Sequence, residues 1–178
     1  LPGGPRQARP GHRARSVAAG LLLGTGAAVA NLLTMLAAGG PGRGATAWLA
    51  ALGNPAAALA LVGHVAVLAP VAEELAFRGV LYRQLRRVFA PAAAIAVSAA
   101  VFAAMHASLG QAAWALLLGL VAAASYEQTA SLVTPTLVHG LFNAVRVGVL
   151  LVRSRPSDLG PLWLVFARTL WGKKILAA

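Results

Sequence analysis

The chain has 178 residues, of which 59% are hydrophobic and only 11% are charged. Because a soluble domain of this size carries about a quarter charged residues, the composition predicts a membrane protein. The formal net charge of +11 does not indicate a nucleic-acid partner, since the basic residues cluster beside apolar runs, as the positive-inside rule expects. The sequence contains no cysteine, which excludes disulfides, thiolate chemistry and cysteine metal sites.

The N-terminal region combines a basic tail with a first apolar run. Residues 1–15 are rich in Pro, Gly and Arg and predict a disordered tail. Residues 17–42 carry no Asp, Glu, Lys or Arg and are long enough to span a bilayer. The string Ala28-Val29-Ala30 would also suit signal-peptide cleavage. Because the apolar run continues past this string, we favour a retained first span.

The middle of the chain alternates apolar runs with short breaks. A helix is predicted from Pro55 to about residue 87, with a bend at Pro70, because proline removes an internal hydrogen bond. Further spans are predicted at residues 91–107, 111–126 and 135–152. The sequence therefore predicts an all-α fold, a polytopic transmembrane helical bundle of about five to six helices over residues 16–152.

The ends of the chain set the expected orientation. Four arginines precede the first span, which places the N-terminus in the cytoplasm. Residues 153–178 form a basic C-terminal segment. Its apolar piece at residues 161–172 either spans the membrane or lies on its surface.

Two adjacent glutamates are the most unusual feature of this apolar chain. Glu73 and Glu74 follow a stretch without any charged residue from Gly44 to Ala72, and they are half of the four acidic residues. A charge at the bilayer centre costs about 2.5–3.5 kcal/mol, so such residues face the bundle interior and mark functional sites. Adjacent helical residues point about 100° apart. One glutamate should therefore face water as a general base, and the other should pair with Arg78 at i,i+4.

Two histidines and an asparagine lie in the later apolar runs. His139 and Asn143 share one helical face, as do Phe102 and His106, and Phe102 is expected to shape the pocket. Glu73 lies about sixteen residues before the turn between its helix and that of His106, and His106 lies about sixteen after it. Both residues are then roughly 24 Å from the turn, so they should be level.

A carboxylate, two imidazoles and a carboxamide that converge in a low-dielectric bundle can activate a water. His106 would hold the nucleophilic water or bind a metal, and His139 with Asn143 would donate hydrogen bonds to a developing oxyanion. A zinc site would need Glu73 or Glu74 together with both histidines. Nothing in the sequence demands a metal, so zinc stays a possibility only.

These residues resemble the motifs of a known family. The string EELAFRG, the pair Phe102-x-x-x-His106 and the pair His139-x-x-x-Asn143 resemble the three motifs of the CPBP family, the CAAX prenyl endopeptidases and bacteriocin-processing proteins, also called the Abi family. The resemblance covers about residues 66–150. It implies an intramembrane endopeptidase, often classed as a metalloendopeptidase, that cleaves membrane-associated or prenylated CAAX-type substrates.

The resemblance also implies roles for individual residues. Glu73 would be the catalytic base, Glu74 its companion beside Arg78, and His106 the residue that positions the water. The two residues of the third motif would support the oxyanion.

The resemblance implies a multi-pass protein of a bacterial cell membrane, with membrane lipids and a membrane-associated peptide or protein substrate as partners. The oligomeric state stays open. The alternative function is a non-catalytic protein of the same fold that acts in bacteriocin self-immunity or as a scaffold. A small proton-coupled transporter would also use buried Glu and His, but the sequence shows no second half with broken helices of its own.

Overall fold

The described part of the chain is built of helices. The computed structural model describes residues 10–37, 55–106 and 108–153, and every regular element within these ranges is helical. The predicted all-α fold is therefore confirmed for these residues. The expectations for residues 1–9 of the tail and for the apolar piece at residues 161–172 lie outside the described residues.

The first helix, α1 (Pro10–Ala37), begins earlier than the sequence suggests. Residues 10–15 are predicted to belong to a disordered tail, but they are helical. The physical reason is that a proline at the first helical position needs no N–H partner and has a φ angle that suits a helix. Arg13 and Arg15, ahead of the apolar run, thus lie in the first helix.

The second helical run is continuous from Pro55 to Val88 and matches the predicted helix closely. Its segments follow one another without a break: α3 (Pro55–Gly63), η1 (His64–Leu68), α4 (Ala69–Glu74), η2 (Leu75–Tyr82) and α5 (Arg83–Val88). The segments η1 and η2 are π-helical, a rare form that occurs frequently at functional sites. Pro70, where the sequence predicts a bend, lies in the first turn of α4, which follows η1.

Further helices, joined by tight turns, complete the described bundle. They are α6 (Pro91–Ala104), α7 (Leu109–Thr129) and α8 (Val133–Arg153). The Ser108 hydroxyl caps the start of α7, since it accepts a hydrogen bond from the Gln111 N–H at 3.3 Å. Ala130, in the left-handed conformation with φ of 52°, follows its last turn. Because α6 ends at Ala104 rather than near residue 107, His106 lies in the turn and not within the predicted helix.

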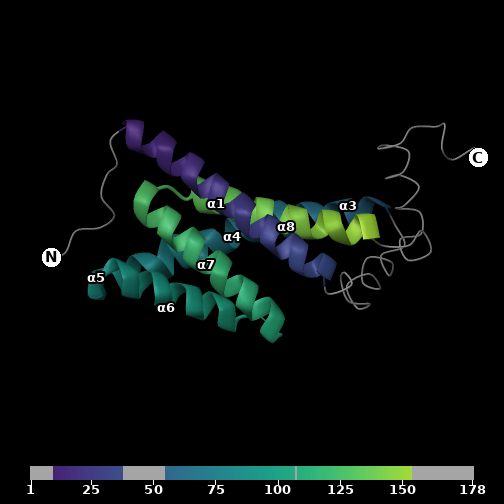
Figure 1. Cartoon of the computed structure of the whole chain (residues 1–178). Helices are drawn as coiled ribbons and strands as arrows, with labels where there is room; N and C mark the ends of the chain where they lie inside the picture. Colours follow the sequence, from purple (N-terminus) through teal and green to yellow (C-terminus); the bar gives the residue numbers. More distant parts are fainter. Residues whose placement is uncertain (1–9, 38–54, 107, 154–178) are drawn as a thin grey trace, which may run out of the picture.

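Helices α7 and α8 lie at the centre of the bundle (Figure 1). Helix α7 packs against α1, α6 and α8, and α8 packs against α1, α4 and η1. Helix α1 approaches α8 closely at Gly24, where a Cβ atom would lie 2.7 Å from Val138 Cγ1. Small residues at such crossings are typical of helix packing in membranes. The core between these helices is apolar and includes Ala28, Phe102, Leu118, Val138 and Phe142.

A polar cluster ties the end of the second helical run to α7. Tyr82 is fully buried, and its hydroxyl donates to Glu127 Oε2 at 2.9 Å. Arg86 Nε donates to the same oxygen at 3.1 Å, and Arg86 Nη2 donates to Glu127 Oε1 at 3.2 Å. Glu127 therefore fastens η2 and α5 to the last turns of α7.

By length and composition, two helical runs in the described ranges can cross a membrane. They are Leu59–Val88, with mean hydropathy 1.6, and Leu109–Thr129, with mean hydropathy 1.5. Large apolar side chains also point outward from several helices, among them Leu22, Leu68, Val88 and Leu109. Outward apolar side chains of this kind mark contact with a membrane or with another protein.

Candidate active site

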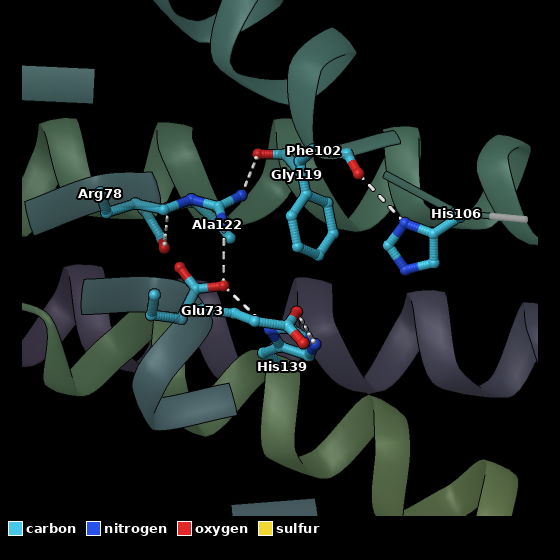
Figure 2. Close-up of polar contacts among 9 residues, drawn as sticks. Glu73, Arg78, Phe102, His106, Gly119, Ala122 and His139 are labelled. Carbon is cyan, nitrogen blue, oxygen red and sulfur yellow. Dashed lines mark hydrogen bonds and ion pairs between the residues drawn. The ribbon is translucent and has the colours of Figure 1, made fainter. Parts of the chain in front are cut away.

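An ion pair in the middle of the bundle is fully shielded from solvent. Glu74 and Arg78 are both 0% exposed, and Arg78 Nη1 donates to Glu74 Oε1 at 2.8 Å. The other terminal nitrogen, Nη2, donates to the Gly119 carbonyl of α7 at 2.9 Å (Figure 2). The predicted i,i+4 pair is therefore confirmed, and it ties the second helical run to α7.

The same carboxylate oxygen orients a histidine from α8. His139 is buried, and its Nδ1 lies 2.9 Å from Glu74 Oε1. Because a carboxylate paired with arginine only accepts hydrogen bonds, Nδ1 carries the hydrogen and donates it. Nε2 lies on the other side of the ring, 3.7 Å from Glu73 Oε2. Arg78, Glu74 and His139 thus form one buried chain of contacts that ends at Glu73.

The two adjacent glutamates have different surroundings, as their angular separation on the helix predicts. The side chain of Glu73 is 40% exposed and lines a cavity of about 170 Å³, whereas that of Glu74 is 0% exposed. Figure 2 shows Glu73 beside His139, with Arg78 and His106 on opposite sides of the view. Glu73 is therefore the more accessible carboxylate of the two. The predicted pairing of the other glutamate with Arg78 is confirmed, and the role of Glu73 as the base stays a prediction.

Phe102 packs against both histidines (Figure 2). Its ring centroid lies 5.1 Å from that of His106 and 5.6 Å from that of His139, edge-on in both cases. Arg78 Cζ lies 5.1 Å from the Phe102 centroid, a cation–π contact. His106 Nδ1 lies 3.0 Å from the Phe102 carbonyl. Since a carbonyl only accepts, His106 donates from Nδ1 and keeps Nε2 available for the cavity.

Most of the residues that the sequence singles out meet at this cavity. Its polar lining consists of Glu73, His106, Gln111, His139, Asn143 and Arg146. Glu74 and Arg78 lie behind this lining, where they hold His139. The sequence analysis misses Gln111 and Arg146. Arg146 has a signal that could have been used, because it follows His139 by seven residues and so shares its helical face. Gln111, in the first turn of α7, has no comparable signal.

A family model for type II CAAX prenyl endopeptidase, Rce1-like, matches residues 55–145, just over half of the chain. The chain belongs to this family. The Rce1-like match confirms the resemblance found in the three motifs, all of which lie inside the matched range. No curated protein and no solved structure gives a significant match. At the level of the family, the protein is therefore a membrane-associated endopeptidase.

In this Rce1-like site, Asn143 also fixes the position of α8 on the second helical run. In η1 the Ala69 N–H bonds the His64 carbonyl, five residues back. The same spacing would require Val65 to accept from Pro70, which has no N–H. Asn143 Nδ2 donates to the Val65 carbonyl at 3.0 Å instead. Because a carboxamide has a second N–H and an oxygen, Asn143 can hold α8 and still offer a hydrogen-bond donor and an acceptor to the cavity that it lines.

The approach of α8 to η1 leaves no room for a side chain at Gly140. A Cβ atom there would lie 2.8 Å from the Ala66 carbonyl oxygen, whereas at Gly148 on the same helix it would meet no atom within 4 Å. We expect Gly140→Ala to displace α8, to lower the free energy of unfolding by about 1–3 kcal/mol and to slow peptide cleavage. Gly148→Ala should be neutral or slightly stabilising. Thermal unfolding and cleavage rates in one detergent check this, and equal behaviour of the two variants would contradict it.

The residues of the possible zinc site, Glu73, His106 and His139, all line the cavity. Within the described residues, no three His, Asp or Glu side chains come together as a group that could hold a metal ion. Each histidine uses Nδ1 in a contact with another group, which leaves Nε2 free, and His139 Nε2 lies 3.7 Å from Glu73 Oε2. The zinc site therefore stays a prediction.

Proposed function

We propose that the protein is an intramembrane endopeptidase that hydrolyses peptide bonds of membrane-associated or prenylated, CAAX-type substrates. The observation that carries the proposal is the different placement of two adjacent glutamates. Glu73 lines the cavity together with His106 and His139, while Glu74 is buried behind His139 and paired with Arg78. Such a site combines a base that water can reach with an imidazole held in one orientation.

Glu73 acts as the general base in this proposal. A water positioned by Glu73 and His106 Nε2 gives a proton to the Glu73 carboxylate and attacks the carbonyl carbon of the scissile bond. The resulting oxyanion accepts hydrogen bonds from His139 and Asn143. The proton then passes from Glu73 to the leaving amine as the C–N bond breaks. One water is consumed, and the products are a carboxylate and an amine.

Glu74 serves the reaction through His139 rather than through the substrate. It accepts the hydrogen of His139 Nδ1 at 2.9 Å, which fixes the ring and stabilises its positive charge when Nε2 is also protonated. A doubly protonated His139 can donate from Nε2 to the oxyanion. Arg78 balances the charge of Glu74 and bonds Gly119, so that two helices hold the geometry.

The same proposal places the protein in a bacterial cell membrane as a multi-pass bundle with a cytoplasmic N-terminus. Two long apolar helical runs and outward apolar side chains support this location. The basic residues at the end of the second helical run, Arg83, Arg86 and Arg87, support a cytoplasmic position for that end. Membrane lipids then surround the bundle, and the substrate reaches the cavity from the membrane.

Reconstitution with a tethered substrate tests this function. Purified protein in lipid vesicles would be mixed with a fluorescent peptide anchored by a C-terminal prenyl group, and with the same peptide lacking that group. We expect cleavage at one bond and faster turnover of the anchored peptide. If no anchored peptide is cut while the protein still protects cells against a bacteriocin, the non-catalytic immunity function replaces the proposed one.

Metal removal gives a further expected result. Incubation with a strong chelator should leave the cleavage rate unchanged, because in the proposed mechanism the Glu73 carboxylate activates the water without a metal. Cleavage before and after chelation would be measured on the same vesicle preparation, with a known zinc protease as a positive control for stripping. Loss of cleavage that added zinc restores would contradict this expectation and would make His106 and His139 ligands.

A further inference from the structure

Helix α8 presents a continuous row of side chains to the cavity. His139, Phe142, Asn143 and Arg146 all line it, and their spacing of three, four and seven residues places them on one helical face. The Arg146 side chain leans back along the helix over Phe142, so its guanidinium is nearer to His139 than the spacing of the Cα atoms alone would place it. The cavity therefore extends along α8 from the reacting end at His139 to a cation at Arg146.

Arg146 has no carboxylate partner within the described residues. Glu74 contacts Arg78 and His139, and Glu127 contacts Arg86 and Tyr82, while Glu73 lies nearest to His139. The Arg146 guanidinium instead lies over the Phe142 ring, with Cζ 5.8 Å from the centroid. A cation held in an apolar bundle without an anion is costly. An anionic group that enters the cavity would therefore bind there favourably.

We propose that Arg146 binds the free C-terminal carboxylate of the substrate, an inference that rests on the proposed function. Arginine is suited to this ligand because its planar guanidinium can donate two parallel hydrogen bonds to one carboxylate. The proposal adds a recognition site to the catalytic one. It makes a chain terminus, rather than an internal loop of a membrane protein, the preferred substrate.

The spacing along α8 limits the length of the leaving peptide. Seven residues rise about 10 Å along a helix, and an extended peptide covers about 10 Å in three residues. With the scissile carbonyl beside His139 and the terminal carboxylate on Arg146, at most about three residues lie between the cut and the chain end. A C-terminal C-a-a-X sequence, with three residues after its prenylated cysteine, is within this limit.

Binding of matched peptides tests the inference separately from cleavage. The full-length protein carrying Glu73→Gln, which leaves peptides intact under the proposed function, would be titrated with a labelled peptide ending in a prenylated cysteine and three further residues. The peptide would be used as a free acid and as a C-terminal amide. We expect the acid to bind about 10- to 100-fold more tightly than the amide, the range of a hydrogen bond to a charged group.

Variants at two arginines show whether Arg146 is responsible. Arg146→Gln should remove the preference for the acid. Arg146→Lys should retain part of it, because lysine keeps the charge but cannot donate two parallel hydrogen bonds to one carboxylate. Arg83→Gln, the same change at an exposed arginine outside the cavity, should keep the full preference.

Several results would overturn the inference: no binding of the acid, equal affinity for acid and amide, or an acid preference that survives Arg146→Gln. Failure of the proposed function would give a different experimental result. If protein with an intact Glu73 binds the acid selectively but never cuts it, Arg146 remains a carboxylate site and the endopeptidase proposal is wrong.

Discussion

Replacement of Glu73 by glutamine is expected to lower kcat/KM for cleavage of a membrane-tethered peptide by about 10²- to 10⁴-fold, the usual contribution of a general base. Glutamine keeps the size and the hydrogen-bonding oxygen of the side chain but cannot take a proton from water. Because Glu73 is the partly exposed member of the pair, the change should leave the buried contacts of Glu74 intact. Steady-state kinetics in vesicles, with unfolding curves for both proteins, measure this.

Glu127→Gln is the matched control for this result. The chemical change is the same, but Glu127 does not line the cavity and instead accepts hydrogen bonds from Tyr82 and Arg86. We expect a modest loss of stability, on the order of 1–3 kcal/mol, from weaker hydrogen bonds of Tyr82 and Arg86 to the uncharged acceptor, with cleavage largely retained. Equal loss of activity in both variants, with equal loss of stability, would show that the effect at Glu73 is structural.

The second large effect is expected at the buried ion pair. Glu74→Ala leaves the Arg78 guanidinium 0% exposed without its carboxylate, a change that costs about 3–5 kcal/mol of folding free energy in buried pairs. His139 loses the acceptor of its Nδ1 hydrogen at the same time, so cleavage should fall as well. Unfolding in mixed detergent micelles and the cleavage rate of the surviving folded protein measure the two effects separately.

A double variant separates structure from chemistry at this pair. Glu74→Leu combined with Arg78→Met removes both charges and fills the space with apolar groups, which in buried pairs is often neutral for stability. The double variant should therefore be more stable than Glu74→Ala alone, yet remain inactive because His139 is no longer held. A double variant that is as unstable as the sum of its single changes, or one that regains cleavage, would contradict the role assigned to Glu74.

The different placement of the two glutamates was predictable because it depends on local helix geometry. Two neighbours on a helix point about 100° apart, and a residue four positions on lies on the same face. These rules place Glu74 on the same helical face as Arg78 and Glu73 on a different face, independently of how the other helices pack. The sequence predicts level positions for Glu73 and His106 for a similar reason, since a short turn between two helices sets their register, and both residues line the same cavity.

Features that depend on contacts between distant helices were not predictable in this way. The hydrogen bond from Asn143 to the Val65 carbonyl requires the π-helical segment η1, a missing N–H at Pro70 and the close approach of α8. The sequence shows the proline but not which side chain donates to the carbonyl that the proline leaves without an N–H partner. The apolar composition predicts His106 within a helix because it does not reveal that α6 ends at Ala104.

Arg146 shows the limit of composition-based reasoning most clearly. An arginine near the end of an apolar helix is ordinarily read as a flanking charge, and its spacing from His139 gains meaning only when both residues line one cavity. The early start of α1 was missed for a similar reason. A basic segment of low hydropathy gives no periodic signal, although Pro10 is compatible with the start of a helix.

The most direct test of the account is a single-turnover experiment with product masses as the readout. Wild-type protein and the Glu73→Gln variant would be reconstituted in excess over a prenyl-anchored peptide, and the products would be identified by mass spectrometry. The account predicts that wild type converts the peptide into two fragments whose masses sum to that of the substrate plus one water, and that Glu73→Gln leaves the peptide intact. The same fragments at the same rate from Glu73→Gln would contradict it.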